Sequence, residues 1–455
     1  SDQSGTKRWI VDAGLVVDGP VKESGTVIIT PETSEIIDVT DALVAGSFAP
    51  VIYTGNGTSQ SIDVGFAPDL VWIKARNKAD YHIWQDTVRG VPKYVSSNVT
   101  DAQQDGDYYI TSFDPNGFTV DLGLSVNQDD IDYVAWCWKA SDTTVTNNDG
   151  DVPSQVRVGN GFSIVKWTAP DWNGTPQTVG HGLGQAPAFI ITKGLENAAG
   201  WYTYHKDLAV TDANDWYLTL NTNNARQTLE NAWGIDGVPN DKVFGDRELG
   251  WTNRQEVIAY CFASTPGVSA FGAYDGTGSN HTIDCGFEPA FVLIKCTDTA
   301  GEEWMIYDNA RNPVNPRDNI LRAETDAVEG NFQQRYVDFE KNGFSFPGTS
   351  GQEPINQSGR KYIYAAFGGE VNQTTLEFVN DKELDLFANA TTNLTVTQDA
   401  GYTPVTSAIS SVVSGVGGVT TQIPQGGTGD WEGILGAPRS AGSSTFFNFA
   451  DGGGQ

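Results

Sequence analysis

Residues 53–74 read YTGNGTSQSIDVGFAPDLVWIK, and residues 274–295 read YDGTGSNHTIDCGFEPAFVLIK. The leading Tyr, both turn glycines and the pattern Ile-Asp-x-Gly-Phe-x-Pro-x-x-Val-x-Ile-Lys recur at one offset, 274 − 53 = 221. We call this stretch the opening motif. A match of this length at such a long period indicates a whole domain that was copied, not a short solenoid unit.

The match continues well beyond the opening motif. The further pairs are Asp86 and Arg89 with Asp308 and Arg311, 100–102 with 325–327, 116–118 with 342–344, and 133–138 with 362–367. The offset grows along the chain, which is typical of insertions that collect in surface loops while strands keep their register.

A more divergent copy lies between these two. Residues 182–193, GLGQAPAFIITK, correspond to the opening motif, and residues 257–262, VIAYCF, correspond to the closing strand. We therefore expect three modules of about 100 residues, each large enough to bury its own core. The expected boundaries are 51–142, 160–265 and 270–370, flanked by a β segment at 1–50 and a β/Gly-Ser-rich segment at 371–455.

The pattern predicts an all-β fold of three tandem β-sandwich-like modules with short β-rich terminal segments. Short β-branched and aromatic runs are bounded by Gly, Pro, Asn or Asp, and Asn-Gly at 116–117 and 342–343 predicts hairpin turns. The best short-helix candidate is 224–231, and a polar linker is expected at 143–153.

Composition excludes several classes of partner. The net charge is −30, with 27 Lys plus Arg against 57 Asp plus Glu. Nucleic-acid binding needs a cationic surface, so no nucleic-acid partner is expected. No apolar run approaches the roughly 20 residues of a membrane-spanning helix, so no membrane insertion is expected.

Cysteine and histidine patterns argue against metal sites and cofactors. Cys137 and Cys261 occupy one repeat position, where the third copy has Ala366, so we expect small buried core residues. Cys285 and Cys296 have no such constraint, and their pairing stays open. There is no CxxC motif, the four His are scattered, and the acidic runs at 129–132 and 147–151 do not fit an EF-hand loop.

The opening and closing motifs together resemble a repeat module of tail fibre and other virion appendage proteins of tailed bacteriophages, of the marine phage type. The resemblance covers about 51–370 and includes, besides the motifs above, 201–205 (WYTYH), 218–221 (LTLN) and 307–313 (YDNARNP). It implies a virion location and an oligomer, often a trimer, and it supplies no catalytic residue and no ligand.

The repeated acids invite a glycosidase interpretation, because such enzymes need paired carboxylates. However, Asp63 and Asp284 each stand two residues before a glycine and are natural turn formers. Asp86 with Arg89, and its repeat in the third module, has the i, i+3 spacing of a loop-locking ion pair. We therefore expect no catalytic residue and no enzyme.

Carbohydrate binding has one candidate loop. Asp171, Trp172 and Asn173 lie in a polar turn, and Trp172 has no partner in the other copies. The alternative is that Trp172 packs at a sandwich edge or between modules, since large aromatic side chains are usually buried.

These observations favour a non-enzymatic structural virion protein, either a tail fibre or a similar appendage that contributes to host-surface recognition. The alternatives are a capsid decoration or head fibre protein and a polysaccharide-degrading tailspike. The expected partners are further copies of the chain, with a trimer favoured, other virion proteins through 1–50 or 371–455, and a host-surface glycan or protein.

Overall fold

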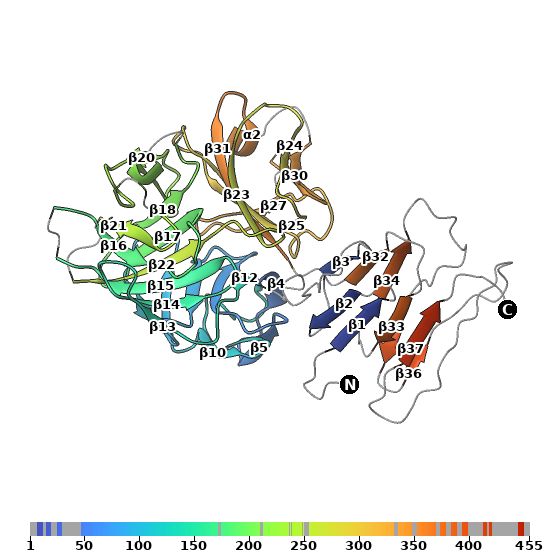
Figure 1. Ribbon diagram of the computed structural model, residues 1–455. Coiled ribbons are helices and arrows are strands. Elements are labelled where there is room, and N and C mark those ends of the chain that lie inside the picture. The colour runs from blue at the N-terminus through green and yellow to red at the C-terminus, as the bar shows by residue number, and fades with distance from the viewer. Residues whose placement is uncertain are drawn as a thin grey trace, which may run out of the picture. The chain divides into compact units, whose positions relative to one another are not determined.

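The computed structural model describes residues 47–369, except 172–173, 210–212, 236, 238, 248, 250–253, 332–334 and 348–352, together with strand segments outside that range (Figure 1). The chain divides into two compact units, one formed by 46–369 and the other by 1–45 with 370–455. Each unit is described by itself.

The predicted fold class is confirmed, because the described residues form antiparallel sheets with almost no helix. Helical segments among them are η1 (Ala213–Asp215) and α2 (Glu353–Asn356). The helix expected at 224–231 is wrong. Gln227 and Thr228 form an edge strand instead, because an eight-residue window is too short to hold a helix without packing support.

The first module is a sandwich of a six-stranded and a three-stranded sheet. The larger sheet has the order β4 (Phe48–Thr54), β12 (Asp132–Trp138), β6 (Leu70–Ala75), β7 (Ile83–Asp86), β8 (Lys93–Ser96), β9 (Gln104–Asp105). The smaller sheet has the order β10 (Ile110–Asp114), β11 (Gly117–Val120), β5 (Gln60–Asp63).

The third module repeats this topology strand for strand. Its larger sheet has the order β23 (Ser269–Asp275), β31 (Lys361–Gly368), β25 (Pro289–Cys296), β26 (Trp304–Asp308), β27 (Asn319–Arg322), β28 (Gly330–Asn331). Its smaller sheet has the order β24 (His281–Asp284), β30 (Gly343–Phe346), β29 (Asp338–Glu340).

The second module keeps the six-strand order and adds two strands at one edge. Its larger sheet has the order β13 (Val145–Asn147), β14 (Ser154–Val158), β15 (Phe162–Thr168), β22 (Glu256–Phe262), β17 (Phe189–Gly194), β18 (Trp201–His205), β19 (Trp216–Thr219), β20 (Gln227–Thr228). Strands β16 (Gln177–Gly180) and β21 (Val243–Asp246) form the opposing pair. The segment expected as a linker thus contributes β13 to this sheet.

Each larger sheet is buried on both faces. In β12, Tyr133, Ala135 and Cys137 face the module's own smaller sheet and join the core of that sandwich. The alternate residues Val134, Trp136 and Trp138 belong to a different cluster. Strands β22 and β31 divide their residues in the same way.

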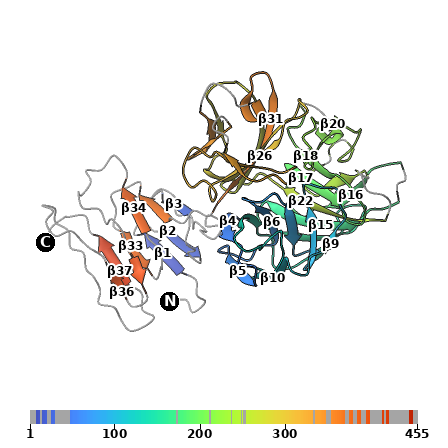
Figure 2. The same cartoon turned by 180° about the vertical axis from the view of Figure 1, so that it is seen from behind.

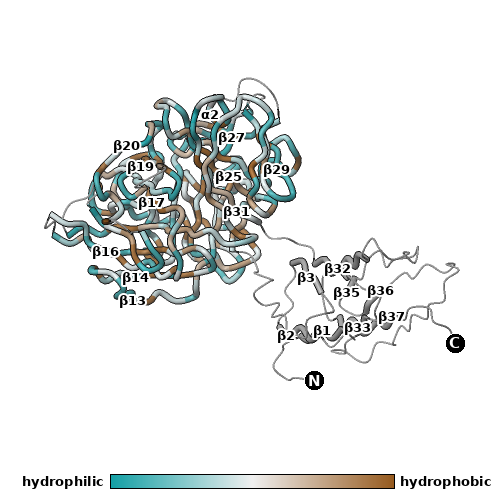
Figure 3. Tube along the Cα trace, turned by 45° about the horizontal axis from the view of Figure 1, so that its top comes forward, coloured by the Kyte–Doolittle hydropathy of each residue, from teal (hydrophilic) through white to brown (hydrophobic). Residues whose placement is uncertain are grey.

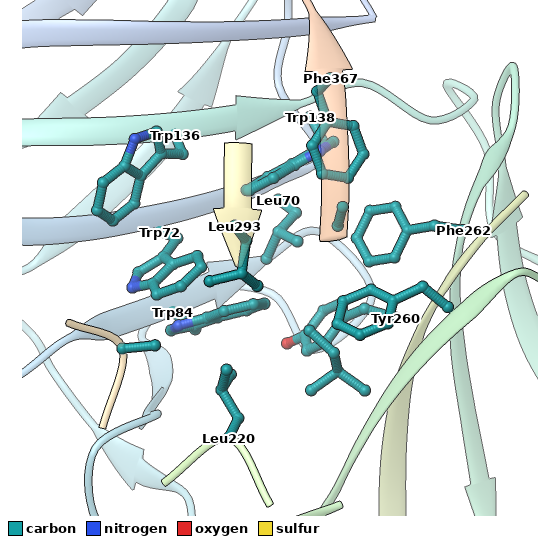
Figure 4. Packing of buried hydrophobic residues seen from close by; sticks show 14 of the residues in the cluster. Leu70, Trp72, Trp84, Trp136, Trp138, Leu220, Tyr260, Phe262, Leu293 and Phe367 are labelled. Carbon is teal, nitrogen blue, oxygen red and sulfur yellow. The ribbon is translucent and has the colours of Figure 1, made fainter. Parts of the chain in front are cut away.

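The second cluster is a core shared by all three modules (Figure 4). Trp138, Phe262 and Phe367 occupy one repeat position on β12, β22 and β31, and they meet one another. Their ring centroids are 6.0 Å apart for Trp138–Phe262, 5.5 Å for Trp138–Phe367 and 5.3 Å for Phe262–Phe367. Three equivalent side chains in mutual contact place a pseudo-threefold axis through this point.

The views from the front and from behind agree with this arrangement. The first module (blue to cyan), the second (green) and the third (yellow to orange) lie against one another in both (Figures 1 and 2). Apolar segments lie among the packed strands, and polar segments form many of the surrounding loops (Figure 3). The unit is therefore a closed ring of three sandwiches within one chain.

The other unit joins segments from both chain ends. Strand β1 (Lys7–Val11) pairs with β2 (Leu15–Gly19) and with β33 (Leu384–Ala388), which pairs with β37 (Thr445–Phe449). Strand β3 (Gly25–Ile29) pairs in parallel with β32 (Thr374–Phe378), and β32 pairs in parallel with β34 (Leu394–Gln398). Strands β35 (Val413–Gly415) and β36 (Gly418–Thr420) form a hairpin.

Candidate functional site: the seams between modules

The predicted glycan loop is described only in part. Asp171 follows β15 and is exposed, and its carboxylate accepts hydrogen bonds from Arg254 Nε at 3.0 Å and Arg254 Nη2 at 2.7 Å. Trp172 and Asn173 lie outside the described residues. Glycan binding at this loop therefore stays a prediction.

Two of the repeated acids form turns, as the sequence predicts. The Asp63 carboxylate accepts a hydrogen bond from the backbone N–H of Gly65 at 3.0 Å, and Asp284 does the same for Gly286 at 2.8 Å. Both glycines have positive φ, at 90° and 79°, a conformation that favours glycine. These acids stabilise equivalent turns in two modules.

The other repeated acids form the predicted ion pairs. Arg89 Nε donates to Asp86 Oδ2 at 2.5 Å, and Arg311 Nε donates to Asp308 Oδ2 at 2.5 Å. All four side chains are buried. In each pair the arginine backbone N–H also donates to the aspartate, at 2.8 Å, which closes the loop after β7 or β26.

Each aspartate also binds a neighbouring module, which the sequence does not show. The Tyr260 hydroxyl donates to Asp86 Oδ2 at 2.9 Å, and Trp136 Nε1 donates to Asp308 Oδ2 at 3.0 Å. Strand register places His205 at the equivalent position of the second module, where its Nε2 bonds the carbonyl of Tyr364 in the third at 3.2 Å. The first module thus binds the second, the second binds the third, and the third binds the first.

A second set of hydrogen bonds, all made by ring nitrogens, joins the same three pairs of modules. We name these seams 1–2, 2–3 and 3–1 after the modules they join. Trp201 Nε1 donates to the carbonyls of Ser96 and Val99 at seam 1–2, at 3.0 and 3.2 Å. Trp304 Nε1 donates to the 219–222 loop at seam 2–3, at 3.1 and 3.2 Å. His82 holds the equivalent position at seam 3–1, with Nε2 at 3.1 Å from the carbonyl of Thr325.

Backbone hydrogen bonds repeat around the ring too. Every seam has two. Seam 1–2 has Ala199 N to Thr100 O (2.9 Å) and Gln103 N to Leu195 O (2.8 Å), seam 2–3 has Gly301 N to Asn223 O (2.9 Å) and Arg226 N to Thr297 O (2.8 Å), and seam 3–1 has Asp80 N to Asp326 O (2.9 Å) and Glu329 N to Arg76 O (2.7 Å). Such agreement means that the three seams share one docking geometry, as in a cyclic homotrimer. Strand register makes Thr100, Asn223 and Asp326 equivalent, so the sequence pairing of 100–102 with 325–327 is wrong by one residue.

Charged pairs strengthen two of the seams. Arg76 binds Glu329 through Nε at 3.0 Å and Nη2 at 2.9 Å, and Arg311 Nη1 also reaches this carboxylate at 3.1 Å. Burial raises the pKa of Glu329, but the two guanidinium groups outweigh it, so that the pKa is lowered. Arg157 pairs with Asp69 at seam 1–2, at 2.9 Å.

A fully buried lysine ends the opening motif in every module. Lys74, Lys193 and Lys295 each donate from Nζ to the carbonyl of the next residue, at 2.7, 2.8 and 2.7 Å. Burial lowers the pKa of each amine to about 8. Our sequence reasoning missed these residues as buried groups, although a lysine that ends all three copies of the motif was a visible signal.

The cysteine and metal expectations concern other positions. Cys137 and Cys261 are buried free thiols, as predicted, and Cys285 and Cys296 are also free. Within the described residues, no group of three or more His, Cys, Asp or Glu side chains could hold a metal ion. No described helix is long and apolar enough to cross a membrane.

The seams are thus chemically suited to binding one module to the next, since their buried acids already have partners within the chain.

No curated protein and no solved structure gives a significant match to the chain. A family model described as "Domain of unknown function (DUF7483)" matches residues 45–370, which is more than half of the sequence and spans all three modules. The chain therefore belongs to this family.

Proposed function

We propose that this chain is a non-enzymatic structural protein of a tailed-phage virion, a tail fibre or similar appendage that contributes to host-surface contact. The phage setting is supported by the resemblance of the repeat motifs. The structural role is supported by the three equivalent seams, which join the modules into one rigid support for exposed loops.

The observation that carries the proposal is the use of the repeated acids. Asp86 and Asp308 are buried, each bonded to an arginine and to a neighbouring module. A glycosidase needs two carboxyl groups that face a sugar across the bond being cleaved. These two instead stabilise separate seams, which favours a scaffold over a polysaccharide-degrading spike.

Contact with a host would depend on how several copies of the chain assemble. A single weak glycan site gains strength when several copies act together, so assembly of several chains would provide avidity. We propose that the unit formed by 1–45 and 370–455 attaches the chain to other virion proteins or to further copies. A trimer remains the favoured assembly.

Imaging of the virion tests the location. Gold-labelled antibody against the purified chain, applied to particles of the encoding phage, should label the tail. Labelling of the shell would instead support the capsid decoration alternative, and unlabelled particles with none of the chain in their protein content would overturn a virion role.

Adhesion and catalysis are tested on the purified chain. We expect it to compete with phage adsorption to host cells and to release no reducing ends from host capsular polysaccharide. On a glycan array, Trp172→Ala should abolish a signal that the control Tyr81→Ala, at an exposed aromatic of the first module, retains. Release of sugar ends would contradict the non-enzymatic assignment.

A further inference from the structure

The ring departs from threefold equivalence at two buried histidines. Position 82 carries His where the other modules have Trp201 and Trp304, and position 205 carries His where the others have an aspartate–arginine pair. His82 contacts the third module at seam 3–1, and His205 contacts it at seam 2–3. Seam 1–2 has Trp201 and Asp86 at these positions.

Hydrogen bonding fixes both imidazoles in one neutral form. Trp72 Nε1 donates to His82 Nδ1 at 2.8 Å, so this nitrogen must be an acceptor and the proton must lie on Nε2, which faces the carbonyl of Thr325. The backbone N–H of Asp207 donates to His205 Nδ1 at 3.1 Å, which leaves its Nε2 proton for Tyr364. A second proton on either ring would oppose an existing donor.

The surroundings of His82 also disfavour a positive charge. Burial lowers the pKa of His82 well below its usual range, and Lys74 on β6 and Arg311 of the third module act in the same direction. The carbonyls of Thr325 and Arg322 oppose this shift without cancelling it. Burial lowers the pKa of the neighbouring Lys74 amine, and three acids at this seam, Asp80, Asp326 and Glu329, act to raise it.

His205 lies in a similar environment. Burial lowers the pKa of His205 to about 4, although Asp207 opposes the shift; Lys206 reinforces it. The other ring contacts are apolar, from Phe189 and Phe271. Protonation of this ring therefore places between the second and third modules a charge that Asp207 only partly compensates.

Carboxyls near the seams also respond to acid, in both directions. Burial raises the pKa of Asp69, so its protonation favours closure of seam 1–2 as the pH falls. Burial also raises the pKa of Glu324, beside Trp304, to about 7, so its protonation opposes the release of seam 2–3 and reduces the effect of His205 there. Glu329 has a lowered pKa, so its ion pairs at seam 3–1 persist at pH 4.5 and weaken mainly below that value.

We propose that the third module is an acid-released element: protonation of His82 and His205 opens seams 3–1 and 2–3, while seam 1–2 remains closed. In an unfolded or opened segment a histidine titrates near pH 6.5, and the closed ring binds fewer protons than the open ring below that value. Closure therefore weakens as the pH falls, by up to about a hundredfold per histidine between about pH 6.5 and 4.5.

Hydrogen–deuterium exchange of the full chain tests the proposal. Labelling times at about pH 7 and 4.5 are scaled for the intrinsic exchange rate. We expect amide protection at Asp80, Glu329, Gly301 and Arg226, which bond across the two seams of the third module, to fall at least about tenfold. The seam 1–2 amides of Ala199 and Gln103 should keep theirs.

The double variant His82→Gln/His205→Gln should retain protection at all three seams in acid, because glutamine keeps an N–H donor and does not titrate. The matched control His181→Gln should behave as the wild type, since His181 is buried within the second module, with Nε2 at 3.0 Å from the carbonyl of Asn240. Equal loss at all three seams of the wild type, no loss at pH 4.5, or loss in a folded double variant would overturn the proposal. The wild-type comparison between seams decides even if the double variant does not fold.

Discussion

Tyr260→Phe removes one oxygen atom from seam 1–2 and leaves the shape of the buried side chain unchanged. The hydroxyl donates to Asp86 Oδ2 at 2.9 Å and accepts from Arg89 Nη2 at 3.2 Å. Hydrogen bonds to charged groups contribute about 1.5–3 kcal/mol each. Asp86 keeps its bond from Arg89 Nε, and Arg89 Nη2 keeps the carbonyl of Trp84 at 2.9 Å, so neither charge is left without a partner. We therefore expect a loss of about 2–3 kcal/mol in the free energy of unfolding.

Urea denaturation of the full chain at neutral pH, followed by tryptophan fluorescence, measures this loss. Tyr53→Phe is the matched control: its hydroxyl donates to the neutral carbonyl of Val126 at 2.7 Å, within the first module. A neutral bond contributes about 1 kcal/mol, so the control should lose less. If Tyr260→Phe costs no more than Tyr53→Phe, the seam bond does not stabilise the ring in the way its geometry indicates.

Three further changes follow from the same structure. Trp304→Phe should lower the free energy of unfolding by about 2–4 kcal/mol and increase amide exchange at seam 2–3. In the control Trp233→Phe the lost indole bond lies within the second module, so amide exchange at seam 2–3 should stay unchanged. Above about pH 8 the three buried lysines bind fewer protons in the folded chain than in the unfolded chain, so the free energy of unfolding should rise between about pH 7.5 and 9.5. Lys295→Met should reduce the slope of that rise by about a third. A free energy of unfolding that does not change with pH in the wild type would contradict the burial argument. Gly343→Ala should lower the melting temperature sharply or prevent folding, because a Cβ there would lie 1.9 Å from the Ile283 carbonyl oxygen; a melting temperature equal to that of the wild type would refute this.

The sandwiches were predictable because their signals are local. The repeated Tyr53 and Tyr274 stack on Tyr133 and Tyr362 in the same way, with interplanar angles of 17° and 11°. The i, i+3 ion pairs depend on neighbouring residues, which a sequence shows directly. Hairpins form at both Asn-Gly sites, but the predicted turn position is wrong: the turns are 115–116 and 341–342, and Gly117 and Gly343 begin the next strands without positive φ.

The shared core was not predicted, although a signal for it existed. Leu70-Val-Trp-Ile and the run 133–138 are apolar at successive positions, whereas a strand with one wet face alternates. Such runs indicate burial on both faces but do not say what covers the second face. Trp136 lies in such a run, and only the structure shows that the core it joins belongs to all three modules.

The seam contacts could not be found from spacing. Asp86 and Tyr260 are 174 residues apart. The equivalent contacts join Asp308 with Trp136 and His205 with Tyr364, so the residue types differ from seam to seam and the repeat conceals the equivalence. The glycan loop was harder to judge for another reason: it rests on an unrepeated tryptophan, for which the other modules offer no comparison.

Native-state hydrogen exchange in increasing urea at neutral pH tests most directly whether the three modules form one cooperative body. Slowly exchanging amides on β12, β22 and β31 should open with one free energy and one urea dependence, of the size expected for the whole unit 46–369. Three separate free energies, each with the smaller urea dependence of a domain of about 100 residues, would show that the modules fold independently and that the shared core does not unite them.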